Sequence, residues 1–93
     1  MPAIGLLTID LHIPEARSLK DKRRLLSSAK DRLRKLNLSL SETGKHDVHQ
    51  HAQLSVVSVA TDRRGVDRIL NSAIIELERK QPGIILDTRI DWL

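Results

Sequence analysis

Residues 3–24, AIGLLTIDLHIPEARSLKDKRR, decide the fold because they contain a strand, a break and the start of a helix. Apolar side chains alternate over residues 3–13, with Leu7 and Ile9 on the more apolar face and a half-polar set on the other. Such alternation predicts a strand in a sheet that is covered on one face. Pro14 cannot donate a hydrogen bond to a sheet, so it ends the strand.

The helix that follows is expected to begin at Ser18, which can cap it, with Asp21 completing a weak capping box. Apolar side chains then recur at helical spacing, which predicts that one stripe of this helix packs on the sheet. The stripe consists of Leu25, Leu26, Ala29, Leu33 and Leu36. Lys22 falls within the same stripe on a helical wheel. We expect its stem to pack while its ammonium group reaches past the end of the sheet into water.

Positive charge is concentrated in this helix. Residues 17–35 hold nine Lys or Arg and two Asp or Glu, a net +7, in a chain whose total is +4. A helix N-terminus carries partial positive charge, so each cation in the opening turns costs about 0.3–1 kcal/mol at low salt. Local rules are broken most often at functional sites, and clustered cations beside free N–H groups favour anions. The predicted anion- or RNA-binding residues are Arg17, Lys20, Lys22, Arg23, Arg24, Lys30 and Arg34.

Downstream of this helix, the pattern predicts two strands, a helix and a last strand. Every second residue is leucine over residues 36–41, which predicts a strand followed by a loop over 43–50. Residues 54–60 are apolar on both faces, as in a central strand. After a capping Thr-Asp pair, residues 66–77 carry apolar side chains at helical spacing. Pro-Gly then ends the helix, and alternation over residues 84–93 predicts the last strand.

This order of elements is βαββαβ. Two right-handed βαβ crossovers interleave in it and produce a four-stranded antiparallel sheet with both helices on one face. We therefore predict an α+β, ferredoxin-like sandwich formed by a single domain over residues 1–93, with the first and third strands in the centre. An exposed apolar patch on the uncovered face favours a homodimer. The residues expected in that patch are Ile4, Leu6, Val57 and Val59.

Composition argues against several classes of function. Cys, Phe and Tyr are absent and there is one Trp. The chain therefore has no thiol nucleophile and no aromatic platform for stacking RNA bases. It has no G-x-S-x-G, P-loop or dinucleotide motif. Asp10 and His12 could form an acid–base pair on the open face, but a solvated strand is the commoner arrangement. We expect a cytoplasmic, non-enzymatic protein without a cofactor, signal peptide or membrane span.

One cluster resembles a set of metal ligands: His46, Asp47, His49 and His51. Two His at positions i and i+2 share a strand face, and imidazole together with carboxylate suits zinc. No residue from another part of the chain adds a ligand to this cluster. We therefore interpret these side chains as exposed loop residues and assign no metal site.

The segment LHIPEARSLKDKR, residues 11–23, resembles the signature of the YlxP-like family of small bacterial proteins, a domain of unknown function. The pattern differs at His49 and His51, where family members typically carry Trp and Arg. The resemblance implies the ferredoxin-like fold. It also implies a loose association with translation and ribosome maturation, because family genes often lie among genes for such factors. The similarity covers nearly the whole chain and includes Asp31-Arg32-Leu33-Arg34, Asp47, Gln50, Ala52, Thr61-Asp62 and Trp92-Leu93.

Three functional hypotheses follow. The first is a non-enzymatic module that binds structured RNA or the ribosome through phosphate contacts of the basic helix, with no DNA specificity. The alternative is a homodimeric protein-interaction module that docks an acidic protein partner. The third is a metal protein or enzyme that uses the His-rich loop. For an arbitrary domain, a charge run that is only a solvated helix face is the commonest explanation.

Overall fold

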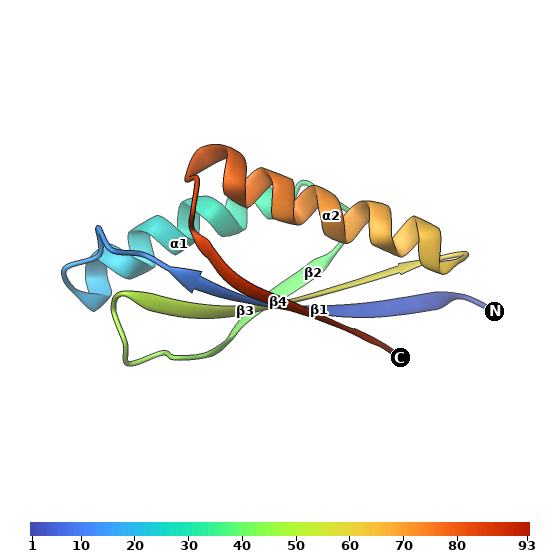
Figure 1. Cartoon of the computed structure of the whole chain (residues 1–93), viewed down its shortest axis with the longest axis horizontal. Coiled ribbons are helices and arrows are strands. Elements are labelled where there is room, and N and C mark those ends of the chain that lie inside the picture. The colour runs from blue at the N-terminus through green and yellow to red at the C-terminus, as the bar shows by residue number, and fades with distance from the viewer.

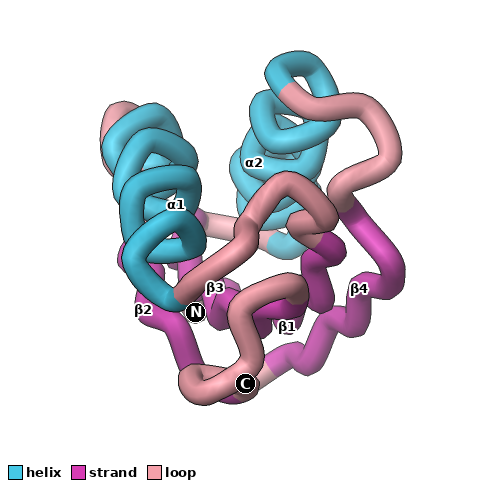
Figure 2. The backbone as a smooth tube through the Cα atoms, turned by 90° about the vertical axis from the view of Figure 1, so that its left-hand side faces the viewer, coloured by secondary structure: helices cyan, strands magenta, loops and turns pink.

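The computed structural model describes residues 1–93 as one four-stranded sheet with two helices on one of its faces (Figure 1, Figure 2). The strand order is β2-β3-β1-β4, and every neighbouring pair is antiparallel. The ferredoxin-like prediction is therefore confirmed, including the central positions of the first and third strands. The elements are β1 (Ala3–His12), α1 (Leu19–Leu33), β2 (Ser39–Gly44), β3 (His51–Ala60), α2 (Arg63–Lys80) and β4 (Ile85–Trp92).

The core lies between the helices and the sheet. The alternation read from the sequence places Leu7, Ile9 and Leu11 of β1 on the buried face, and each is at most 2% exposed. Leu54 and Val56 of β3 lie beside them and are fully buried. Burial of this kind contributes about 1.5–3 kcal/mol for each large side chain before the cost of ordering the chain. The helices complete the core with Leu26, Ala29, Leu33, Val66, Leu70, Ala73 and Leu77.

The opposite face of the sheet is uncovered. Ile4, Leu6, Val57 and Val59 lie on it in register, with Ile4 opposite Val59 and Leu6 opposite Val57. Val59 keeps 51% of its surface exposed. The prediction of an apolar patch on this face is confirmed. No other part of the chain covers the patch.

The second strand begins three residues later than predicted and extends further. The N–H of Leu36 donates to the carbonyl of Leu33 at 3.0 Å, and Arg34 N–H donates to Lys30 at 2.9 Å. The free carbonyls at the end of α1 thus keep the chain in a turn, and Leu36 cannot join the sheet. The third strand, in turn, starts at His51 rather than at residue 54. The hairpin loop is therefore confined to residues 45–50.

Gly5 is required where α2 crosses β1. A Cβ at this position would lie 2.7 Å from Cγ1 of Val66 and 3.2 Å from the ring of Trp92. We predict that Gly5→Ala lowers the free energy of unfolding by about 1–3 kcal/mol, as overpacking does in other cores.

Urea denaturation followed by circular dichroism measures this loss. Gly44→Ala is the matched control, because a Cβ there meets the Oε1 of Gln53 at 2.7 Å, which is the free end of a flexible side chain. The control should change stability by less than about 1 kcal/mol. Equal losses in both variants would contradict the packing argument.

Candidate nucleic-acid interface

The N-terminus of α1 is capped by Ser18 as the sequence predicts, but Asp21 accepts the N–H of Arg17 rather than that of Ser18, so the predicted capping box is not formed. The N–H of Asp21 donates to Oγ of Ser18 at 3.1 Å, and Oδ2 of Asp21 accepts the N–H of Arg17 at 3.2 Å. Two backbone donors are satisfied in this way. The cap fixes where the helix begins, and with it the direction in which each cation of the first two turns points.

Lys22 is buried, with only 3% of its side chain exposed. Its Nζ donates to the carbonyl oxygens of Lys45 at 2.6 Å and Val48 at 2.8 Å, and lies 3.1 Å from Oε2 of Glu42. Three acceptors match the three N–H groups of an ammonium ion. The prediction that this ammonium lies in water was wrong, because the hairpin loop folds over the start of α1. Lys45 adopts the left-handed conformation, φ 59°, that this loop requires.

Three other predicted residues come together in a groove between α1 and β2. Arg23, Lys30 and Arg34 line a hollow of about 290 Å³ together with Ser27 and the carboxylate of Glu42. The nearest approach of Lys30 to Glu42 is 3.9 Å, a weak ion pair. Since Glu42 is held more closely by Lys22, this groove has an excess of positive charge. We call it the α1–β2 groove.

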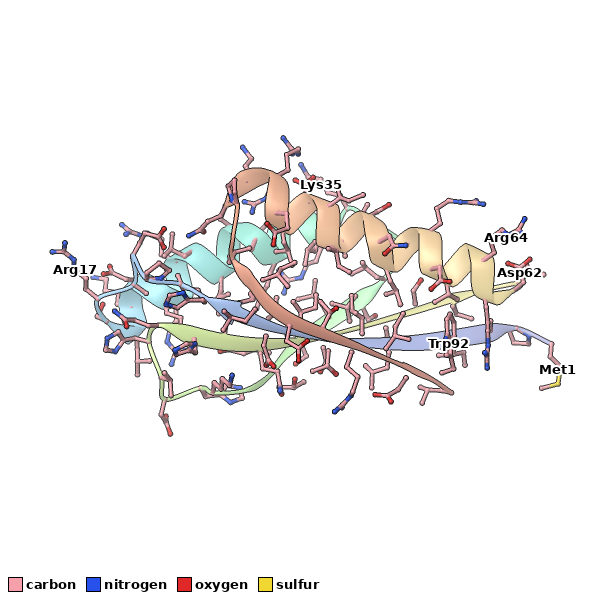
Figure 3. All side chains as sticks on the ribbon, viewed as in Figure 1. Met1, Arg17, Lys35, Asp62, Arg64 and Trp92 are labelled. Carbon is pink, nitrogen blue, oxygen red and sulfur yellow. The ribbon has the colours of Figure 1, made fainter.

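The remaining predicted cations lie along the outer surface of α1 and at its start. Arg24 pairs with Asp21 at 3.6 Å but keeps 77% of its side chain exposed. Arg17 lies at the end of the long axis opposite Asp62 and Arg64 (Figure 3). The molecule measures 45 Å along that axis. Arg17, Lys20 and Arg23 are exposed and form no ion pair. The structure thus places six of the seven predicted residues at the surface of one helix and its approach.

A second basic groove, which the sequence pattern did not predict, lies between the two helices. Arg32 of α1 and Lys35, two residues after the end of α1, meet Arg79 and Lys80 of α2 around a hollow of about 630 Å³. The only carboxylate in its lining is Glu76. The sequence feature that could have indicated this groove is the pair of cations in the last turn of each helix, Lys30 and Arg32 in α1 and Arg79 and Lys80 in α2. That pattern is also expected from helix dipoles alone, so it did not point to a site. We call this the interhelical groove.

The pKa of Glu76 reflects the positive charge in the interhelical groove. Arg79 donates to Oε1 of Glu76 at 2.8 Å, and Nε of Arg32 lies 3.5 Å from the same oxygen. The hydrogen bond from Arg79, with the positive charges of Arg79, Arg32 and Lys80, lowers the pKa of the Glu76 carboxyl below its ordinary value. Glu76 is therefore ionised near neutral pH, yet four cations surround this one anion.

The His-rich loop does not assemble a metal site in this structure. Nε2 of His46 lies 3.3 Å from the carbonyl oxygen of Glu42, while His51 stacks on His12 across the sheet with ring centroids 5.2 Å apart. No three His, Asp or Glu side chains are arranged to hold a metal ion. Asp10 does not pair with His12 and instead contacts Gln53 at 3.4 Å and Lys45 at 3.7 Å.

The fold and this surface define the class: a small ferredoxin-like protein whose first helix carries the excess positive charge. A family model described as Protein of unknown function (DUF503) matches residues 4–90. The chain therefore belongs to the DUF503 family. A search of curated proteins found no match. Neither helix combines the length and the apolar composition that are needed to span a membrane.

Solved structures are similar in fold. The designed protein Foldit4 superposes with a TM-score of 0.59 at 9% identity, covering 100% of this chain and 97% of that one. PA3566 from Pseudomonas aeruginosa gives 0.54 at 20% identity, covering 99% and 91%. The designed protein LFR1 1, described as having a ferredoxin fold, gives 0.50 at 12% identity, covering 100% and 84%. At these identities the similarity concerns the fold alone.

Lys22 provides a direct test of the site's framework. We predict that Lys22→Met lowers the free energy of unfolding by about 2–4 kcal/mol, because two carbonyl groups and Glu42 lose their buried partner. Amide exchange in residues 45–50 should accelerate in the same variant.

Lys20→Met is the matched control, because Lys20 is exposed on the same turn and forms no ion pair. It should change stability by no more than about 0.5 kcal/mol. A Lys22→Met protein as stable as Lys20→Met would show that the buried contacts of Lys22 do not hold the loop.

Proposed function

We propose that this DUF503 protein is a non-enzymatic module that binds structured RNA through phosphate contacts made by α1. The observation that carries the proposal is the α1–β2 groove, in which Arg23, Lys30 and Arg34 surround a single, already paired carboxylate. Ser27 adds a hydroxyl donor to the same groove. Arginine, lysine and hydroxyl side chains are the usual donors to nucleic-acid phosphates.

The chemistry of the chain favours phosphate contacts over recognition of bases. Stacking on a sheet requires exposed aromatic side chains, and the only one of Phe, Tyr and Trp in this chain is Trp92. The ring of Trp92 already has the guanidinium of Arg63 at 4.8 Å. Binding would therefore depend on RNA shape and on salt.

The resemblance to the YlxP-like family adds a candidate target. That family's association with ribosome maturation makes structured ribosomal RNA in the cytoplasm the first RNA to test. The residues that we assign to phosphate contacts are Arg17, Lys20, Arg23, Arg24, Lys30 and Arg34. We exclude Lys22 from these residues, because the three N–H groups of its ammonium already have acceptors within the protein.

Charge reversal in the α1–β2 groove tests this proposal. Arg23→Glu/Arg34→Glu should weaken binding to structured RNA by more than about tenfold at low salt. If about five phosphates are neutralised, log K should fall with log salt with a slope near −4 to −5, and the double variant should reduce that slope by about 2. Fluorescence anisotropy over a salt series measures both quantities.

Arg64→Glu/Arg68→Glu is the control for net charge, because it changes the charge by the same amount, and both residues are exposed on α2, form no ion pair and lie outside both grooves. It should leave affinity nearly unchanged. An equal loss in Arg64→Glu/Arg68→Glu would indicate attraction by net charge alone. No RNA binding at low salt, or binding that is indifferent to salt, would contradict the proposal. Capture of partners with and without nuclease then separates RNA from an acidic protein as the bound species.

A second candidate function is self-association through the open face. Ile4, Leu38, Val57 and Val59 border a hollow of about 380 Å³ on this face, next to the point where β2 begins. A monomer gains nothing from exposing such a patch, whereas a second copy of the chain could cover it by packing sheet against sheet.

A single substitution tests the dimer. Val57→Asp should convert a dimer into a monomer because it buries a carboxylate in the contact. Light scattering after size exclusion measures the mass. Thr8→Asp is the control, because Thr8 is on the same open face but outside the hollow. A wild-type protein that remains monomeric at high concentration would contradict this candidate.

A further inference from the structure

Cations line both sides of α1 and the turn that follows it. Arg23, Lys30 and Arg34 face the α1–β2 groove, whereas Arg32 and, just after the helix, Lys35 face the interhelical groove. Figure 2 shows α1 with α2 beside it and β2 below it. A helix with its side chains is about 10–12 Å across, so the two sets of cations are separated by about one helix diameter.

We infer that α1 lies across a groove of double-stranded RNA, with the cations of the α1–β2 groove binding phosphates of one strand and those of the interhelical groove binding phosphates of the other. This inference rests on the proposed function and narrows it to a substrate class. The residues assigned to the second RNA strand are Arg32, Lys35, Arg79 and Lys80.

The interhelical groove contains one carboxylate, that of Glu76, for four cations. Nε of Arg32 is buried and has no hydrogen-bond partner, because its 3.5 Å approach to Glu76 does not have hydrogen-bond geometry. NH1 of the same guanidinium is held by Oγ of Ser28 at 2.9 Å. Arg32 is thus only loosely paired with Glu76, and its guanidinium leaves positive charge in the groove lining. Lys35 forms no ion pair and is exposed on the same rim.

A duplex explains both sets of cations, and a single strand does not. A single strand that follows one groove leaves the other set without a ligand. In addition, single strands are usually held by bases stacked on aromatic side chains, which this surface lacks. Duplex RNA is recognised through phosphates and 2′-hydroxyl groups across a wide, shallow minor groove, where a helix can contact both strands.

The test compares a blunt RNA duplex with an unstructured single strand of the same length. Arg79→Glu/Lys80→Glu should weaken duplex binding by about tenfold or more and reduce its salt slope by about 2. It should leave single-strand binding within about twofold of wild type. Arg23→Glu/Arg34→Glu should weaken both. The matched control is Arg64→Glu/Arg68→Glu, the same charge change near the other end of α2, which should affect neither.

The outcomes separate this inference from the proposed function. If Arg79→Glu/Lys80→Glu binds the duplex like wild type while Arg23→Glu/Arg34→Glu does not, the second set of contacts is wrong and the proposed function stands. If neither RNA binds the wild-type protein, the proposed function itself fails.

A second variant acts in the opposite direction, so misfolding cannot imitate its expected result. Glu76→Gln removes the one carboxylate of the interhelical groove and should strengthen duplex binding about two- to fivefold. The variant should bind the single strand as wild type does. Unchanged or weaker duplex binding in Glu76→Gln would overturn the assignment of this groove.

Discussion

One buried ammonium group determines how three separate segments meet. Lys22 enters the protein interior from the first turns of α1, and an unpaired charge there would be strongly destabilising. The carbonyls of Lys45 and Val48 and the carboxylate of Glu42 supply its three acceptors. The end of β2, the hairpin loop and the start of α1 are consequently fixed relative to one another. The positions of the basic side chains on α1 depend on this arrangement.

The same interaction explains why the surface of α1 remains positive. Glu42 is the carboxylate closest to the α1–β2 groove, but its Oε2 lies 3.1 Å from Lys22 and its Oε1 is 3.9 Å from Lys30. Because the buried partner holds Glu42 more closely, Arg23 and Lys30 are poorly neutralised, and Arg34 has only a pair at 3.2 Å with the exposed Asp31. In the interhelical groove, Arg79 holds Glu76 most closely, at 2.8 Å, and the lining has no other carboxylate for Arg32, Lys35 and Lys80. Each groove therefore has more cations than its one carboxylate can balance, which leaves positive charge available to a polyanion.

The sequence predicted those parts of the fold that depend on periodicity. Alternation at Leu7 and Ile9 and helical spacing at Leu70 and Leu77 reflect which side chains the core buries, so topology followed from pattern. The predicted start of β2 was wrong because hydrogen bonds at the end of α1, such as that from the N–H of Leu36 to the carbonyl of Leu33, override the alternation of leucines. Lys22 was placed in the apolar stripe correctly, but its acceptors come from loop carbonyls, which carry no sequence signal. The interhelical groove was missed as a whole, because only tertiary packing brings Arg79 and Lys80 beside Arg32.

The two candidate functions use opposite sides of the molecule. The apolar patch of Ile4, Leu6, Val57 and Val59 lies on the open face of the sheet, whereas both basic grooves are lined mainly by residues of the helices. Figure 1 shows that both helices lie on the other face. A dimer that packs sheet against sheet would therefore leave both copies of α1 exposed, on opposite outer surfaces. Two such helices would bind two separate RNA segments rather than one. Self-association would then raise the effective concentration of the second contact without changing the groove that makes the first.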